Sequence, residues 1–108
     1  AAGAELLMMA GQYDAPETKK VVAYLKRNAQ VGSAQFGHRF YTFYYCAQAM
    51  LQLGGPEWEK YFNQLRKELL SAQGSDGSWQ GDIGPTYCTA IAVTLLALPY
   101  QYLPLYQK

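Results

Sequence analysis

The sequence predicts an all-α protein, and three observations support this fold class. Apolar residues recur at spacings of three and four, which is the period of an amphipathic helix. Prolines stand where such segments begin and glycines stand where they end, as expected at helix boundaries. A pattern of helix pairs repeats after about 40 residues, which is typical of helical-repeat proteins. Of the 108 residues 50% are hydrophobic, which excludes a disordered chain.

Five helices are predicted, in a single partial domain that covers residues 1–108. The first helix is short and ends near Gly11. The second begins with Pro16 at its first position and has Leu25 on its apolar face. The third ends at Gly54, a residue type that commonly follows a helix. The predicted helices span residues 4–10, 16–29, 38–53, 56–72 and 85–98.

The fourth and fifth helices differ in the distribution of their apolar residues. The fourth begins at Pro56 and has charged residues opposite its apolar face, so one side of it should be buried. The fifth begins after Gly84 and ends before Pro99. It is apolar almost all round, and we therefore expect it to be buried on most sides. The apolar face of the fourth helix consists of Trp58, Tyr61, Phe62, Leu65, Leu69 and Ala72.

The second and third helices form a pair that recurs as the fourth and fifth. A shift of about 40 residues places Pro16 on Pro56. A slightly longer shift places Tyr45 on Tyr87, each followed by a cysteine, because the loop before the fifth helix is longer. In such an architecture each pair buries its apolar side against neighbouring pairs. The chain is therefore expected to be a stack of helix pairs.

The loop after the fourth helix carries the most specific pattern of the chain. Its residues are Leu69, Gln73, Gly77 and Trp79. This order resembles the QW motif of the squalene cyclase and prenyltransferase repeat superfamily, and the resemblance extends over residues 11–108. It implies an α/α toroid of the terpenoid cyclase and protein prenyltransferase type, with amphipathic helices outside and apolar helices inside. The chain would supply about two and a half helical hairpins of this toroid.

The resemblance also implies that the chain is a piece of a longer protein. Closed toroids of this superfamily contain more hairpins than this sequence can form. Residues 99–108 are rich in Tyr and contain Pro, and they are similar to the carboxyl end of uncharacterised bacterial proteins that carry these repeats. We therefore expect a carboxyl-terminal fragment.

The motif residues are predicted to be structural. Gly77, which follows an Asp, suits a tight turn because Gly tolerates a positive φ. The Gln73 amide can bond backbone groups left open at helix ends and can hold two helices in register. Trp79 can cover the corner between two helices while its indole N–H keeps a polar partner.

Aromatic residues crowd the predicted third helix. Tyr44 and Tyr45 are the best candidates for a ligand cavity because they are nearest to its buried middle, and Tyr87 is the counterpart of Tyr45 in the next repeat. In the terpene cyclases that the chain resembles, cavity aromatics shield carbocations, and an aromatic face attracts a cation. The alternative is ordinary packing, because so many neighbouring aromatics point all round a helix. The run consists of Phe40, Tyr41, Phe43, Tyr44 and Tyr45.

No catalytic residue, metal site or cofactor is predicted within this chain. Cys46 and Cys88 are interpreted as small buried hydrophobes, with a disulfide as the alternative. Zinc is excluded because four suitable ligands cannot be assembled. His38 either caps or faces solvent at the start of the third helix, or acts as an acid or base in a cavity. Asp76 and Asp82 flank a glycine-rich loop in a pattern that favours turns over calcium binding.

Charge and hydropathy limit the partners that the chain can have. The net charge is +1 and basic residues alternate with acids, so no nucleic-acid surface is expected. No apolar run approaches the roughly 18 residues of a membrane-spanning helix. Two functions remain open: part of a cavity for an isoprenoid or another hydrophobic ligand, without catalysis by this chain alone, or a non-catalytic scaffold for protein interactions. Open repeat edges also predict self-association of the chain.

Overall fold

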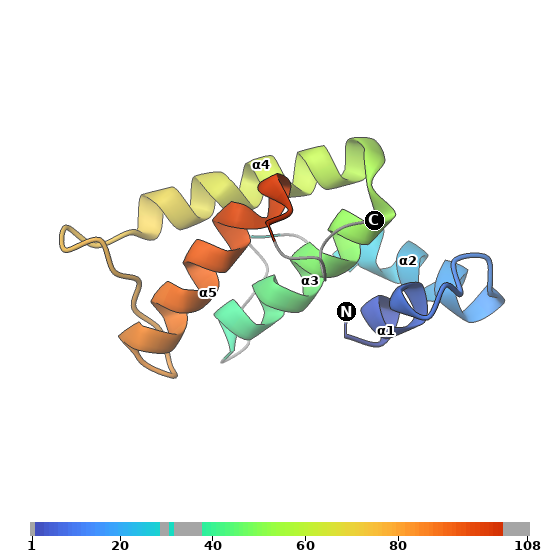
Figure 1. Ribbon diagram of the computed structural model, residues 1–108, viewed down its shortest axis with the longest axis horizontal. Coiled ribbons are helices and arrows are strands. Elements are labelled where there is room, and N and C mark those ends of the chain that lie inside the picture. Colours follow the sequence, from blue (N-terminus) through green and yellow to red (C-terminus); the bar gives the residue numbers. More distant parts are fainter. Residues whose placement is uncertain (1, 29–30, 32–37, 103–108) are drawn as a thin grey trace.

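The computed structural model describes residues 2–28, 31 and 38–102, and its regular elements there are all helical (Figure 1). The all-α prediction is confirmed, and the bounds of the five helices differ from the predicted ones by at most two residues. The predicted last residue of the second helix, Ala29, and the tail residues 103–108 lie outside the described residues. The elements are α1 (Ala2–Met9), α2 (Pro16–Asn28), α3 (Arg39–Leu53), α4 (Gly55–Ala72), α5 (Pro85–Ala97) and the short 3-10 helix η2 (Leu98–Tyr100).

Helix α3 lies at the centre of the arrangement. It contacts α1, α4 and α5, and α1 in turn contacts α2. In Figure 1 α5 lies on one side of α3, and α1 and α2 lie on the other. Among the described residues, none of these helices combines the length and the apolar character needed to cross a membrane.

The core is built around the second half of α3. Residues 46–51 are buried at every position, which a helix covered on one side only would not show. Ala47 and Ala49 are among them, and their small side chains allow neighbouring helices to approach closely. The contacts of α3 with three other helices explain this burial. Leu25, Tyr61, Leu65, Leu69, Leu95 and Leu98 from the surrounding elements complete the core.

Both cysteines are free and buried, so the disulfide alternative is excluded. Burial raises the pKa of the Cys46 thiol, and burial also raises the pKa of the Tyr61 hydroxyl, to which Cys46 is hydrogen-bonded. Both groups therefore stay protonated at neutral pH. The pair joins α3 to α4 inside the core.

Helix α4 is amphipathic, as its sequence predicts. It buries Tyr61, Leu65 and Leu69, which are spaced four residues apart and so lie on one face. Ala72, the last residue of the helix, is exposed.

The expectation that α5 is buried on most sides holds only in part, because an exposed strip remains along the helix. Its buried residues are Cys88, Ala92 and Leu95, which lie on one face of the helix. Val93, on another face, is 55% exposed. The reason is that α5 packs mainly against α3 and η2, so its neighbours cover one side. An apolar composition all round the helix contains no information about which side that is.

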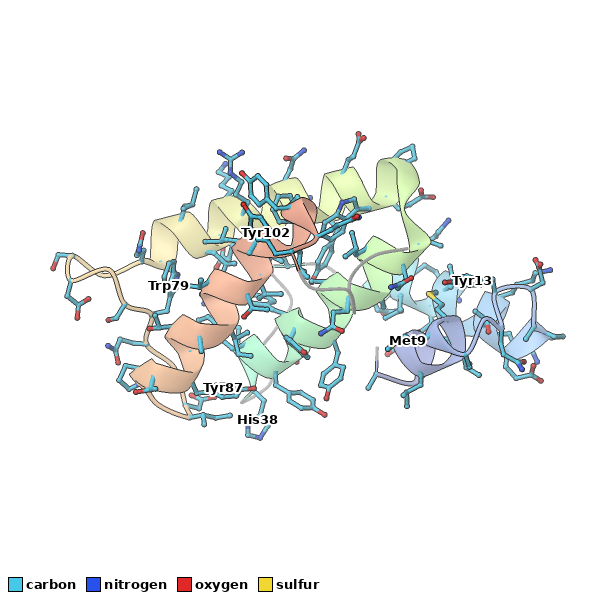
Figure 2. All side chains as sticks on the ribbon, in the orientation of Figure 1. Met9, Tyr13, His38, Trp79, Tyr87 and Tyr102 are labelled. Atoms are coloured by element: carbon cyan, nitrogen blue, oxygen red, sulfur yellow. The ribbon has the colours of Figure 1, made fainter. Side chains whose placement is uncertain are left out.

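Trp79 connects α4 to α5 (Figure 2). Its side chain is 3% exposed, and the indole Nε1–H donates a hydrogen bond of 2.7 Å to the carbonyl oxygen of Leu69, in the last turns of α4. Its backbone N–H donates a hydrogen bond of 3.0 Å to Thr89 Oγ1, in the first turns of α5. One residue is therefore hydrogen-bonded to both helices.

The preceding loop is held by its own hydrogen bonds. The Gln73 amide donates to the carbonyl of Gly77 over 3.0 Å, and Gly77 has a φ of +84°. The Asp76 carboxylate accepts bonds from the backbone N–H and from the hydroxyl of Ser78, and these two bonds lower its pKa. The described bond of Gln73 thus stabilises the loop, whereas the connection between the helices is made by Trp79.

We predict that Trp79→Ala lowers the free energy of unfolding by about 3–5 kcal/mol, because it removes a buried ring and leaves the Leu69 carbonyl without its donor. Urea denaturation followed by circular dichroism measures this change. The control is Trp58→Ala, since Trp58 is only partly buried in α4 and should contribute less. Equal losses in the two variants would contradict the anchoring role of Trp79.

Candidate functional site

A cavity of about 210 Å³ lies between the start of α3 and the segment that leads into α5. We call it the α3–α5 cavity. Tyr87, one of the three tyrosines predicted to line a cavity, is among its lining residues. Figure 2 shows Tyr87 and His38 at the same end of the molecule, where α3 and α5 begin. The cavity is lined by His38, Arg39, Phe40, Tyr41, Gln80, Gly81, Asp82, Ile83, Tyr87 and Cys88.

A turn before α5 places residues 80–83 at the cavity. The N–H of Gly84 donates to the carbonyl of Gly81 over 3.1 Å, and the N–H of Cys88 donates to the carbonyl of Gly84 over 3.1 Å. Gly84 has a φ of +109°, which residues with a side chain rarely adopt. Pro85 follows at the first helical position, where its missing N–H does no harm. This local sequence turns the chain into α5 at the edge of the cavity.

The absence of a side chain at Gly81 lets the turn lie close to both helices. A Cβ at this position would be 2.8 Å from Cys88 Sγ and 3.2 Å from the ring of Phe40. Phe40 and Cys88 are themselves buried, and the Phe40 ring packs edge-on against Phe43 with centroids 6.1 Å apart. This side of the cavity is therefore a tightly packed apolar wall.

The rim of the cavity is polar. His38 is exposed and its side chain makes no capping hydrogen bond to α3, so it does not cap the helix, and it lies exposed at the edge of the cavity. Arg39 forms an ion pair with Glu68 of α4 and lies over the Phe43 ring, 5.2 Å from its centroid. Asp82 is exposed on the opposite segment. The charge of Arg39 is thus compensated by Glu68.

Tyr41 lines the cavity, whereas the described lining does not include Tyr44 or Tyr45. The three tyrosines are in contact: the centroids of Tyr41 and Tyr45 are 4.7 Å apart, and those of Tyr44 and Tyr45 are 5.2 Å apart. Tyr41 is 49% exposed, while the other two are partly buried. An aromatic row therefore leads from the cavity along α3.

Sequence reasoning overlooked Tyr41 and Ile83 as lining residues. Tyr41 belongs to the aromatic run and lies near the start of α3. This position indicates a cavity-lining role for Tyr41, because the segment before α5 meets α3 at the first turn of α3. Ile83 stands alone in a glycine-rich loop and carries no pattern that marks it.

Within the part of the chain that the structure describes, no three His, Cys, Asp or Glu side chains come together in a way that could hold a metal ion. His38 and Asp82 line the cavity as exposed side chains, and Cys88 is buried in its wall. The arrangement offers an apolar aromatic surface with hydrogen-bonding groups at its edge. It is suited to holding a molecule with an apolar body and a polar end.

Comparison with known proteins identifies no relative of this chain. The chain matches no model of a known protein family, no curated protein and no solved structure. The resemblance to the squalene cyclase and prenyltransferase repeat superfamily therefore remains an interpretation of the sequence pattern. The chemistry of the site has to be inferred from its geometry.

We predict that Gly81→Ala destabilises the protein by about 1–3 kcal/mol, because the new methyl group would overlap Cys88 Sγ and press on the Phe40 ring. Thermal unfolding measures the loss. The matched control is Gly3→Ala in α1, where nothing lies within 4 Å of the added Cβ. That variant should be at least as stable as the original chain. A Gly81→Ala protein of unchanged stability would show that the turn does not lie so close to the two helices.

Proposed function

We propose that the chain forms about two and a half helical hairpins of an α/α toroid and that its α3–α5 cavity contributes to a binding site for an isoprenoid or another hydrophobic ligand. The observation that carries the proposal is the composition of the cavity: Phe40, Tyr41 and Tyr87 meet at one end of two neighbouring helices. Aromatic faces provide apolar contact area and can attract a cationic centre.

The order of helix contacts supports the toroid part of this proposal. In a layered α/α repeat, alternate helices belong to the same layer, and each helix of one layer also contacts a helix of the other. Helix α3 contacts α1 and α5, which are its alternate neighbours, as well as α4. Helix α1 contacts α2 in the same manner, whereas the pairs α2–α3 and α4–α5 that the repeat predicts are not among the main contacts of the described helices.

The size of the cavity supports a contributing rather than a complete site. Its volume of about 210 Å³ lies below the roughly 300–1,000 Å³ of typical ligand pockets. The exposed Tyr41 and Ile83 extend the apolar surface beyond the cavity. A longer ligand would therefore continue over this surface towards further contacts.

Binding is a better proposal for these residues than catalysis. A general acid or base has to be held within hydrogen-bond reach of the reacting group. His38 and Asp82 are exposed on the rim, and within the described part of the chain no hydrogen bond or ion pair holds either side chain in one position. We therefore assign no reaction to the cavity.

A titration with farnesol, an isoprenoid alcohol, tests the proposal by nuclear magnetic resonance. We expect a saturable shift of the Ile83 methyl signal and a smaller change at Ile91, which does not belong to the described lining. Tyr87→Ala should weaken binding by at least fivefold, because a ring of the wall is removed, whereas Tyr87→Phe should bind almost normally. Tyr24→Ala is the control, since Tyr24 is 60% exposed on α2. Equal effects of Tyr87→Ala and Tyr24→Ala would count against this site.

A second candidate is a helical scaffold that associates with itself, and the exposed side of α5 favours it. Val93 is 55% exposed although it belongs to an apolar helix, and Ala90 is exposed one turn before it. A second copy of the chain could cover this side. If two copies of the chain associate through this side of α5, a charged side chain placed at its centre should separate them.

We predict that gel filtration with light scattering at micromolar concentration gives a mass above that of the 12.1 kDa monomer and that Val93→Glu restores the monomer mass. Burying an unpaired carboxylate in an apolar contact is unfavourable, which is the reason for the dissociation. The control is Tyr100→Glu on η2, which places the same charge at a more exposed position outside α5. A monomeric original chain would exclude the scaffold in this form.

A further inference from the structure

A second and larger depression of about 610 Å³ lies between α2 and α4. We call it the α2–α4 groove. Its described lining residues do not overlap with those of the α3–α5 cavity, so the two are distinct sites. The lining residues are Leu25, Lys26, Val31, Met50, Glu57, Lys60, Tyr61, Gln64, Lys67, Glu68 and Ser71.

The bottom of the groove is apolar. Leu25 of α2, Val31 and Met50 of α3 line it, and each of these side chains is buried in the core cluster. Tyr61 of α4 adds an aromatic side chain that is also buried. A hydrocarbon chain placed here would contact apolar atoms from three parts of the fold.

The carboxylates of the groove are already paired. Glu57 accepts a hydrogen bond of 2.7 Å from Lys26, and this bond lowers the pKa of the Glu57 carboxyl. Glu68 forms an ion pair with Arg39. Each acid therefore has a cation beside it. They leave no negative charge for the remaining lysines of the groove.

Two lysines of the groove are without such a partner. Lys60 and Lys67 form no ion pair with any side chain that the structure describes. They are seven residues apart on α4, which corresponds to about 10 Å along the helix axis and brings them to the same face. Their long side chains can therefore reach one anion between them. Gln64 stands between the two lysines and offers a further hydrogen-bond donor.

The apolar bottom of the groove and its two lysines together favour one class of ligand. An inorganic anion would use the lysines but leave the apolar bottom in contact with water. A neutral hydrocarbon would cover the bottom but leave the two charges unused. The volume falls within the roughly 300–1,000 Å³ of small-molecule sites. A molecule with a single apolar chain and an anionic head complements both parts.

We propose that the α2–α4 groove binds a single-chain amphiphile with an anionic head group. The chain lies on Leu25, Val31 and Met50, and the head lies between Lys60 and Lys67. The two ammonium groups hold the head through charge-assisted hydrogen bonds. This site is independent of the function proposed for the α3–α5 cavity.

Dodecyl phosphate, used as a monomer below its critical micelle concentration, tests the proposal. With methyl-labelled methionine, we expect a saturable shift of the Met50 signal. The signals of Met8 and Met9, the other methionines of the chain, should change little because both belong to α1. Inorganic phosphate and dodecanol are the comparison ligands, and each should bind at least tenfold more weakly. An equal response to either of them would overturn the proposal.

The double variant Lys60→Gln and Lys67→Gln should bind dodecyl phosphate about tenfold more weakly, because two exposed ion pairs with the head are lost. Its binding of dodecanol should be unchanged. The matched control is Arg66→Gln, which removes one positive charge from the same helix outside the described lining. Gln64→Trp should block binding by filling the groove from an exposed position. Retained affinity in the double variant, or an equal loss in the control, would overturn the proposal.

Discussion

The burial of α3 is the constraint on which the rest of the structure depends. Residues 46–51 are buried at consecutive positions, so this half of the helix needs neighbours on several sides, and α1, α4 and α5 provide them. The first turn of α3 is less covered, and Tyr41 is half exposed there. The α3–α5 cavity lies where the helix begins, and this is where Tyr87 and the turn before α5 meet it.

Trp79 links the buried part of the fold to the candidate site. Its indole bonds to Leu69 of α4 and its backbone bonds to Thr89 of α5, so the segment between Trp79 and α5 starts from a defined point. From there Gly81 reaches close contact with Cys88 and Phe40. A buried residue outside the described cavity lining thus holds the start of the segment that forms the cavity wall.

The two proposed binding sites differ in chemistry but are joined by one ion pair. Arg39 lines the α3–α5 cavity, Glu68 lines the α2–α4 groove, and the two side chains are paired with each other. The pair neutralises a cation at an aromatic site and an anion at a basic one. The cavity is left with aromatic surface as its main feature, and the groove is left with the positive charge of Lys60 and Lys67.

The sequence alone determined the helices and the side of α4 that is buried, because prolines, glycines and apolar spacing act over a few residues, as Pro16, Pro85 and Leu65 show. Only the tertiary structure decided which face of α5 is covered, since nearly every face is apolar and the choice depends on α3. It also decided that Tyr41 lines the cavity, and which lysines of the groove have no ion-pair partner among the described side chains. These properties arise from contacts between residues distant in sequence, and the local pattern of a chain contains no record of them.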